Sequence, residues 1–392
     1  MKLLIYDDIH ELTILHSISD LELEYAALDG NPDVIFVRSK DLKKLNLPRS
    51  LVAIGRAGSG VDNIPIDWCN QNGVAVFNAP GENANAVKEL VLAALVLASR
   101  PAFQAASALI KNPGKPEELK KQYKGVELAG ASIRVIGMGA IGSRVAKTCV
   151  SLGMKVFAYD PYLKSFDTLG GAITVLPDIQ ALRAQWTRYI TLHCSLTDTN
   201  REMIDGKFFA AGVKIINFAR AELINEPQLL EELITGRVSA YISDFVPKKV
   251  PIEEFFKTGN AIFLPHLGAS THESETRATE KVGARVDDFF YQGICRGSVN
   301  LPDMPSEKAE PGRVRLLVSN QDKPGIIERV TKAISAAGLN IGSMTNRSRK
   351  DSGLALNYID VDLESPDGRL QAVCDIINAI DGVTRARVIG NS

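Results

Sequence analysis

Gly137, Gly139 and Gly142 form a GxGxxG pattern, which is the spacing of a loop that holds phosphate. The pattern directly follows the strand-like run IRVI and opens a helix-like segment rich in valine, alanine and lysine. In such a loop the first glycine permits a tight turn, the second lets the backbone approach a pyrophosphate, and the third lets the helix pack on the strand. The helix N-terminus also attracts the phosphate charge. The sequence therefore predicts a dinucleotide-binding site.

Asp160 ends the next strand-like run, KVFAYD, eighteen residues beyond Gly142. A carboxylate at this place can accept hydrogen bonds from both ribose hydroxyls of NAD and would repel the 2′-phosphate of NADP. The alternative is that Asp160 only caps a turn before Pro161. We predict that the cofactor is NAD.

Arg220 and His266 are candidates for the chemistry itself. Arg220 follows the strand-like run KIINFA and His266 follows AIFLP, so both fall at the carboxyl ends of predicted strands, where ligands bind in open parallel sheets. Hydride transfer from a 2-hydroxy acid needs a base for the hydroxyl proton and a cation for the carboxylate. Histidine and arginine have these properties. Considered alone, Arg220 could equally be an ordinary surface arginine, and His266 could equally be a histidine of the core.

Two series of short apolar runs separated by helix-length spacers must position these residues. The first series lies in the N-terminal 80 residues, and the second begins at residue 132 and contains about six strands. Continuous apolar strands of this kind predict parallel sheets covered by helices on both faces, which is an α/β fold. The segment 84–98 is apolar around most of its circumference, as in a buried helix that crosses between domains or packs at a subunit interface.

The composition changes after Asn300. Residues 301–312 contain three prolines and four charged residues, which is typical of a linker. The remaining residues, 313–392, follow the order strand, helix, strand, strand, helix, strand of a ferredoxin-like βαββαβ module. The predicted domains are a substrate-binding domain at 1–84 and 273–300, a cofactor-binding domain at 85–272, the linker at 301–312 and the module at 313–392.

Charge and hydropathy exclude several classes of function. The chain has 392 residues, and its 45 Lys and Arg against 46 Asp and Glu give a net charge of -1, without the basic excess that nucleic-acid binding needs. Its longest apolar stretch, Leu90 to Ala98, is far shorter than the roughly 20 residues that span a bilayer. We therefore expect neither a nucleic-acid partner nor a membrane association, and a cytoplasmic location.

The cysteines and histidines do not indicate a metal site. The five cysteines are scattered and contain no CxxC pair, and the five histidines have no HExxH or other paired ligand spacing. We expect the cysteines to be reduced core residues and expect no metal ion.

Segments along most of the chain resemble one known family. The chain resembles the D-isomer-specific 2-hydroxyacid dehydrogenases, in particular those that act on a phosphorylated substrate and carry a C-terminal ACT domain. The resemblance implies two Rossmann-like or flavodoxin-like parallel-sheet domains, NAD as cofactor, and oxidation of 3-phospho-D-glycerate to 3-phosphohydroxypyruvate in L-serine synthesis. The motifs that carry it are VRSK (37–40), GRAGSGVDNI (55–64), VFNAPGENANAVKELVL (76–92), GMGAIGSRVA (137–146), YDPY (159–162), ITLHCSLTDTNREMI (190–204), INFARAELINE (216–226) and LPHLGASTHESE (264–275).

The resemblance also implies residue roles. Arg220 would hold the substrate carboxylate and His266 would be the general acid and base. Asp244 would contact the nicotinamide amide. The residues expected around the cofactor are Gly137, Gly139, Ala140, Ile141, Gly142, Asp160, Cys194, Phe218, Ala219, Arg220, Asp244, His266, Gly268 and Ala269.

The implied substrate groups come from several segments. Arg56, Ala57, Gly58 and Ser59 would form the loop that meets the carboxylate. The phosphate would bind Arg38 and Lys40, with Lys120 or Lys121 from a neighbouring subunit. The alternative is that the lysine pair is only solvated.

One departure from the family pattern concerns the partner of the catalytic histidine. The family keeps a glutamate five residues after the position of Asp244, but Lys249 stands there. An alignment counted backward from His266 instead assigns this role to Glu254, with Glu253 as its rival, and makes residues 246–250 an insertion. Loop insertions are well tolerated, so we predict that Glu254 supports His266.

The resemblance of residues 313–392 to an ACT domain implies an amino-acid effector, commonly L-serine, and assembly into a homodimer or homotetramer. Asn320, Asp322 and Asn340 would face the effector. The alternatives are that the module only dimerises or binds another effector.

Two other functions remain open from the sequence. One is a dehydrogenase of another D-2-hydroxy acid. The other is a catalytically impaired homologue that senses NAD or amino acids, which Lys249 motivates.

Overall fold

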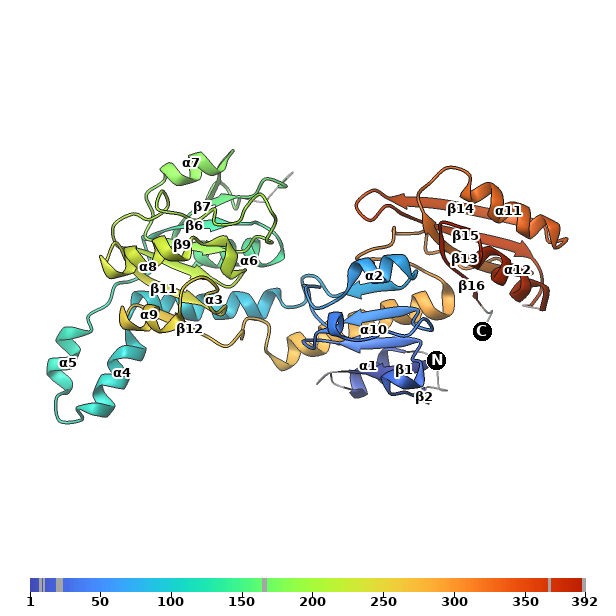
Figure 1. Cartoon of the computed structure of the whole chain (residues 1–392). Coiled ribbons are helices and arrows are strands. Elements are labelled where there is room, and N and C mark those ends of the chain that lie inside the picture. Colours follow the sequence, from blue (N-terminus) through green and yellow to red (C-terminus); the bar gives the residue numbers. More distant parts are fainter. Residues whose placement is uncertain (7–8, 10, 19–23, 164–167, 366–367, 390–392) are drawn as a thin grey trace. The chain divides into compact units, whose positions relative to one another are not determined.

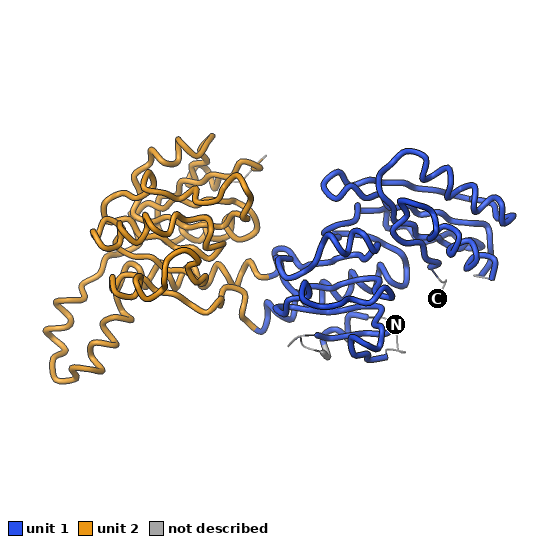
Figure 2. The backbone as a smooth tube through the Cα atoms, viewed as in Figure 1, with its two compact units in different colours: residues 1–82, 272–392 blue, residues 83–271 orange. Residues whose placement is uncertain are grey.

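The computed structural model describes all residues except 7–8, 10, 19–23, 164–167, 366–367 and 390–392, and only the backbone at 11, 12 and 15. The chain divides into two compact units, shown in Figure 2. Unit 1 contains residues 1–82 and 272–392, and unit 2 contains residues 83–271.

Unit 2 is built on a seven-stranded parallel sheet in the order β12-β11-β10-β9-β6-β7-β8. The strand order reverses between β6 and β9, which is the switch point where dinucleotides bind in such sheets. About six strands were predicted, and the sheet has one more. Its strands are β6 (Ser132–Ile136), β7 (Lys155–Tyr159), β8 (Ile173–Val175), β9 (Tyr189–Leu192), β10 (Val213–Asn217), β11 (Val238–Ser243) and β12 (Ala261–Phe263).

Helices cover both faces of this sheet, as the continuous apolar strands predict (Figure 1). On one face, α3 and α6 form a core with Ile133, Val135 and Val156. On the other face, α7, α8 and α9 pack with Ile190 and Ile215. The helices of unit 2 are α3 (Ala84–Ser99), α4 (Ala102–Lys111), α5 (Pro116–Gln122), α6 (Ala140–Ser151), α7 (Ile179–Ala184), the short 3-10 helix η3 (Ala221–Leu223), α8 (Glu226–Ile234) and α9 (Ile252–Lys257).

Among the described residues, no single helix is both long enough and apolar enough to cross a bilayer. Helices α3 and α4 together meet the criterion of length and composition, but they are bent by 61° with respect to each other.

The N-terminal part of unit 1 is a five-stranded parallel sheet in the flavodoxin-like order β2-β1-β3-β4-β5. The sequence predicted four of these strands, and the fifth is the two-residue edge strand β2. The long helix α10 packs against β4 and β5. The elements are β1 (Lys2–Ile5), α1 (Glu11–Ser17), β2 (Glu24–Tyr25), η1 (Leu28–Gly30), β3 (Val34–Val37), η2 (Leu42–Lys44), β4 (Ala53–Arg56), α2 (Ile66–Gln71), β5 (Ala75–Asn78) and α10 (His272–Gln292).

The C-terminal module is a four-stranded antiparallel sheet in the order β14-β15-β13-β16, with α11 and α12 on one face (Figure 1). Its order of elements is the βαββαβ order predicted from the sequence, and the predicted fold class is confirmed. The elements are β13 (Arg313–Gln321), α11 (Ile326–Ala336), β14 (Ile341–Arg349), β15 (Leu354–Asp362), α12 (Gly368–Asn378) and β16 (Val383–Ile389).

The other face of this sheet packs against the N-terminal part of unit 1. Strand β13 shows why: Leu316 and Val318 face the two helices, whereas Leu317 joins a core that includes Phe289 of α10. The backbone N–H of Cys295 donates to the Tyr358 hydroxyl at 2.8 Å across the same contact. The module is therefore part of unit 1, although the sequence predicts a linker before it.

Buried arginines on β16 hold this contact. Arg387 donates to the carbonyls of Phe289 and Phe290, at 2.9 Å to the latter, and lies over both rings. These carbonyls belong to the last turn of α10, where backbone carbonyls have no hydrogen-bond donor within the helix. Arg387 thus caps the helix C-terminus and complements its dipole. Burial lowers the pKa of the Arg387 guanidinium.

We expect Arg387→Ala to lower the free energy of unfolding by about 2–4 kcal/mol, because it removes the donor from two partly buried carbonyls and opens a cavity. Arg347→Ala is the matched control, since Arg347 also donates across this contact, to the Asp303 carbonyl at 3.1 Å, but is exposed. Its expected cost is below about 1 kcal/mol. Denaturant unfolding of both variants measures the difference, and equal losses of stability would contradict the capping role.

Candidate active site

The glycine loop at the end of β6 has the geometry that a pyrophosphate needs. A Cβ at Gly137, whose φ is +91°, would lie 2.6 Å from the Cys194 nitrogen, and one at Gly142 would lie 1.8 Å from the Gly137 oxygen. At Gly139 a Cβ would meet no described protein atom within 4 Å, so space is open beside this residue. Helix α6 begins at the next residue, Ala140, and Ile141 follows in its first turn. Two glycines are thus required by protein contacts, and the third borders free space at a helix N-terminus.

Asp160 is fixed at the end of β7 beside this loop. One carboxylate oxygen accepts from the Met138 N–H at 2.7 Å and the other from the Tyr162 N–H at 2.8 Å. Asp160 therefore does hold a turn, as the alternative interpretation expects. A carboxylate has about four acceptor sites, so these two bonds leave capacity for ribose hydroxyls.

Asp244, directly after β11, is a buried carboxylate that is only 3% exposed. Its Oδ2 accepts from the Gly268 N–H at 2.9 Å, while its Oδ1 is buried without a hydrogen-bond partner in the described part of the chain. Burial raises the pKa of Asp244, and the Gly268 amide and the charges of His266 and Arg220 oppose this rise. A buried acceptor without a donor suits the amide of a nicotinamide ring. The residues present therefore fit NAD.

The other residues predicted at the cofactor lie on the same edge of the sheet. Cys194 follows β9 and is half-buried, and burial raises its thiol pKa to about 11. Phe218 and Ala219 follow β10 and are buried. Ala269 follows Gly268 and is half-buried.

Asn217 shapes the loop that carries Arg220, and the sequence analysis missed it. This fully buried residue accepts from the Ala219 N–H at 3.1 Å and donates to the Arg220 carbonyl at 2.8 Å. The available signal was a polar residue that ends an otherwise apolar strand.

Arg220 and His266 share one aromatic neighbour, Phe245. The Arg220 Cζ lies 5.5 Å from the centre of the Phe245 ring, and the His266 ring centre lies 4.7 Å from it. His266 is exposed and has a φ of +52°, a strained conformation for a residue other than glycine. Such strain concentrates at functional sites. The two predicted catalytic side chains are thus brought to one ring, and Phe245 is a second residue that the sequence analysis missed.

The structure does not bring Glu254 to His266. Glu254 forms an ion pair with Lys257 at 2.5 Å, one helical turn along α9, and no hydrogen bond joins it to His266 in the described structure. Glu253, its rival, is exposed. Lys249 pairs with Glu202. Lys257, three residues along the same helix, competes for the Glu254 carboxylate. Asp244 is the carboxylate next to His266, whose backbone N–H donates to the Asp244 carbonyl at 3.1 Å. Burial raises the pKa of Asp244, and the charge of His266 opposes this rise.

The predicted phosphate residues lie at the carboxyl end of β3 in unit 1. Arg38 forms an ion pair with Glu275 at 2.5 Å, and the Lys40 ammonium lies 5.0 Å above the Tyr6 ring. The Asn63 side chain donates to the carbonyls of both cationic residues and so fixes this loop. Lys120 lies on α5 of unit 2, where it pairs with Glu117 at 3.5 Å and is 76% exposed; Lys121 is also exposed.

The carboxylate loop lies at the end of β4, which pairs with β3 through Val37 and Arg56. Arg38, Lys40 and Arg56 are therefore at one edge of the sheet. A Cβ at Gly58 would lie 1.7 Å from the Arg56 guanidinium, so only glycine lets that side chain cross the loop. The remaining loop residues are Ala57, which is buried, and Ser59, whose hydroxyl donates to the Ala79 carbonyl at 3.3 Å.

The three predicted effector residues are not brought together within one chain. Asn320 is 2% exposed and accepts from the Asn357 amide at 2.7 Å, and Asp322 follows at the same end of β13. Asn340 donates to Asp362, which pairs with the opposite end of β13. A nine-residue strand is about 30 Å long, which separates the two groups.

The described residues contain no group of three or more His, Cys, Asp or Glu side chains that could hold a metal ion.

Comparisons with known proteins cover most of the chain. Residues 92–268 match the NAD binding domain of the D-isomer specific 2-hydroxyacid dehydrogenases, and residues 310–387 match an ACT domain. The chain is 32% identical over 326 residues to a D-3-phosphoglycerate dehydrogenase of Methanocaldococcus jannaschii, covering 79% of this chain and 61% of that protein. It is 34% identical over 255 residues to a hydroxypyruvate reductase of Thermotoga maritima, covering 62% of this chain and 80% of the relative.

Among solved structures, an NAD+-bound 3-phosphoglycerate dehydrogenase from Entamoeba histolytica superposes with a TM-score of 0.63 at 25% identity, covering 78% of this chain and 99% of that one. The match to the Archaeoglobus fulgidus D-3-phosphoglycerate dehydrogenase covers 53% of that protein. The chain thus aligns with between half and two thirds of the length of these first two curated relatives.

The glycine loop gives a test of the cofactor site. We expect Gly139→Ala to fold with a stability within about 0.5 kcal/mol of the wild type but to raise the Kd for NADH at least about tenfold, because its methyl group occupies the open space. Gly142→Ala should instead lower stability by about 1–3 kcal/mol, because its Cβ overlaps the Gly137 carbonyl. Denaturant unfolding and NADH fluorescence titration measure the two effects. Unchanged NADH affinity in Gly139→Ala would contradict this location of the site.

Proposed function

The chain belongs to the D-isomer-specific 2-hydroxyacid dehydrogenase family, and we propose that it oxidises 3-phospho-D-glycerate to 3-phosphohydroxypyruvate with NAD as hydride acceptor. The observation that carries the proposal is the placement of Arg220 and His266 around one ring, next to the buried carboxylate of Asp244. This reaction would be the first step of L-serine synthesis through phosphorylated intermediates.

In this mechanism His266 accepts the proton of the substrate hydroxyl. NAD, held by the glycine loop and Asp160, would supply the acceptor for the hydride of the carbon that carries this hydroxyl. Arg220 holds the substrate carboxylate, since a guanidinium can bind a carboxylate through two parallel hydrogen bonds. The negative charge of Asp244 attracts the imidazolium that forms when His266 takes up the proton. Proton transfer and charge compensation thus come from neighbouring loops of unit 2.

The substrate phosphate is assigned to Arg38 and Lys40, which unit 1 presents beside Arg56. Arg38, which is paired with Glu275 in this structure, and Lys40 lie at one sheet edge, and their positive charges favour a dianionic group over a neutral hydroxymethyl or methyl group. These positive charges would make the site prefer a phosphorylated acid to D-glycerate and D-lactate.

The test is steady-state NADH formation with 3-phospho-D-glycerate, D-glycerate and D-lactate, each with and without millimolar L-serine. We expect turnover of the phosphorylated acid alone. Arg38→Ala should raise its KM about 10- to 100-fold, the equivalent of one charge-assisted hydrogen bond. Lys44→Ala is the control, since this nearby lysine is 83% exposed and pairs only weakly with Asp41 at 3.8 Å.

Other outcomes of this assay support other functions. Turnover of an unphosphorylated acid would identify a dehydrogenase of another D-2-hydroxy acid. NADH binding without turnover of any of these acids would favour the impaired homologue that senses NAD or amino acids. Inhibition by L-serine would support an effector role for the ACT domain, in which Asp322 and Asn340 are the exposed members of the predicted set.

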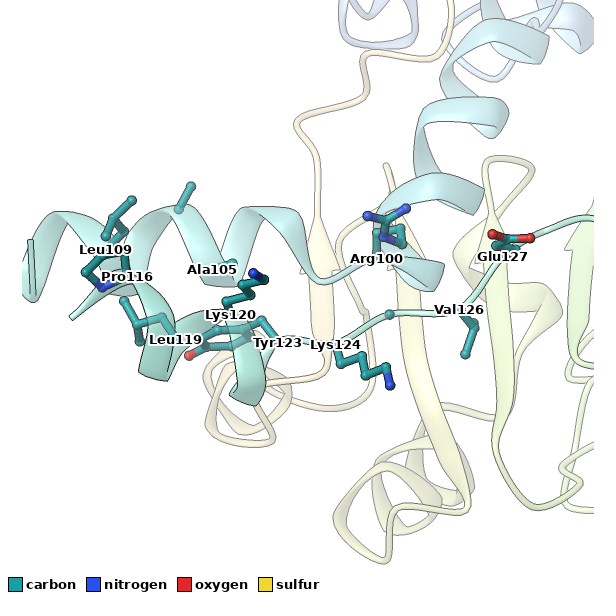
Figure 3. A pocket seen from close by; sticks show the side chains of 12 residues that line it. Arg100, Ala105, Leu109, Pro116, Leu119, Lys120, Tyr123, Lys124, Val126 and Glu127 are labelled. Atoms are coloured by element: carbon teal, nitrogen blue, oxygen red, sulfur yellow. The ribbon is translucent and has the colours of Figure 1, made fainter.

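We also propose that the chain forms a homodimer through the hairpin of α4 and α5. Neither helix contains a buried residue, and Phe103 and Ile110 are 62% and 81% exposed. Figure 3 shows the hollow between the helices, which is lined by Leu109, Leu119, Tyr123 and Lys120. An apolar hairpin that no described part of its own unit covers suits a second copy of the chain.

We expect the wild type to migrate as a species of about 85 kDa, twice the chain mass of 42.5 kDa, and Ile110→Glu to be a monomer at micromolar concentration. Ile234→Glu is the control, since Ile234 is 70% exposed on α8, outside the hairpin. Light scattering after size exclusion measures the mass. An Ile110→Glu protein that stays dimeric would rule out this interface.

We assign the activity to a reducing compartment such as the cytoplasm. All five cysteines are unpaired, and burial raises the thiol pKa of Cys69, Cys149 and Cys374 to about 12. Unpaired buried thiols are typical of proteins from such compartments.

A further inference from the structure

We propose that Glu226 is a positioning residue that joins the Arg220 loop to the loop containing Phe245, the aromatic neighbour of both catalytic side chains. This inference rests on the proposed function, because it assigns a role in that reaction to a residue outside the catalytic groups. The inference depends on the contacts of one buried carboxylate.

The Glu226 carboxylate is 5% exposed and accepts hydrogen bonds from three successive backbone amides. Lys248 N–H donates to both oxygens at 2.9 and 3.0 Å, Lys249 N–H to Oε2 at 2.7 Å, and Val250 N–H to Oε2 at 3.2 Å. Bonds from backbone amides to a charged acceptor are stronger than neutral ones. Three donors on consecutive residues fix the path of the main chain, which a single side-chain contact would not do.

Glu226 is itself rigidly connected to Arg220. The short helix η3 occupies residues 221–223, and Asn225 caps α8 by accepting from the Gln228 N–H at 3.1 Å. Glu226 is the first residue of α8. The Asn217 amide fixes the start of the same loop through the Arg220 carbonyl. The Glu226 carboxylate is therefore held in place relative to the Arg220 backbone.

The amides that it binds lie close to Phe245 along the chain. Only Val246 and Pro247 separate Phe245 from Lys248, and proline restricts the backbone further. On the preceding side, the Ser243 hydroxyl accepts from the Phe245 N–H at 3.1 Å. The Phe245 backbone is thus fixed on both sides, and its ring lies 5.5 Å from the Arg220 Cζ and 4.7 Å from the centre of the His266 ring.

Surface ion pairs do not account for the fixed loop. Lys248 pairs with Glu222 and Lys249 with Glu202, but the two lysine side chains are 63% and 62% exposed. Exposed ion pairs of this kind contribute little to stability. Removal of the buried Glu226 carboxylate, in contrast, takes the hydrogen-bond acceptor from three backbone amides. The loop conformation therefore depends on Glu226.

The experiment compares the wild type with Glu226→Ala and Glu226→Gln. For Glu226→Ala we expect a fall in kcat of about 10- to 100-fold, the effect of a misplaced catalytic group, with the Kd for NADH within about twofold of the wild type. Glu226→Gln keeps one acceptor oxygen, so its kcat should lie between that of the wild type and that of Glu226→Ala. Hydrogen–deuterium exchange of residues 246–250 should be slowest in the wild type, faster in Glu226→Gln and fastest in Glu226→Ala.

Glu232→Gln is the matched control. Glu232 lies on the same helix and is also largely buried, with 16% of its side chain exposed, but it pairs with Arg237 instead of the loop. We expect its kcat and the exchange of residues 246–250 to equal those of the wild type.

The possible results separate this inference from the proposed function. Faster exchange in Glu226→Ala with an unchanged kcat would refute a role in positioning, and unchanged exchange would refute the contact itself. If Glu226→Ala does not fold, the same comparison is made with Glu226→Gln. If the wild type oxidises none of the hydroxy acids, the proposed function fails, and the role of Glu226 in the reaction fails with it. The exchange data would then still decide whether Glu226 fixes the loop.

Discussion

The parallel pairing of the seven strands in unit 2 is the constraint on which the site depends. Parallel strands place all their carboxyl ends at one edge, so segments that are far apart in the sequence end up as neighbours. Gly137 directly follows β6, Asp160 follows β7, and Asp244 follows β11. Arg220 and His266 each lie three residues after the end of their strand, β10 and β12. The close contact of Gly137 with Cys194 and Gly142 lets β6, β9 and α6 meet at the switch point. Larger residues there would separate the sheet from the helix whose N-terminus faces the cofactor.

This regularity explains what the sequence could predict. Glycine spacing, polar residues at strand ends and apolar runs are local patterns, so the fold class and the positions of Arg220 and His266 after their strands followed from them. Contacts for which several partners compete could not be predicted from such local patterns. Glu254 has Lys257 within one helical turn, and only the structure shows which partner it binds. Phe245 and Glu226 act through rings and backbone amides that have no sequence pattern of their own.

Buried arginines were also beyond the reach of sequence patterns, because an arginine in a strand usually indicates an exposed position. Arg134 in β6 is 1% exposed and donates to the Thr187 hydroxyl at 2.9 Å and the Phe208 carbonyl at 3.0 Å. Arg385 in β16 donates to the Asn72 and Arg49 carbonyls. A guanidinium has five donors in a fixed plane, so carbonyls from different segments can satisfy it together. Such contacts specify the packing of one segment on another more narrowly than apolar side chains alone.

The same reasoning bears on the meaning of Lys249. A lysine at the place of the family's glutamate would indicate lost catalysis if its ammonium pointed toward the histidine, where it would oppose the imidazolium. Its ammonium instead pairs with Glu202, and its backbone amide binds Glu226. The charged group that interacts with His266 is Asp244, whose pKa is raised by burial, a rise that the charge of His266 opposes. Lys249 therefore contributes to the loop through its backbone amide, while Glu202 compensates the charge of its ammonium group.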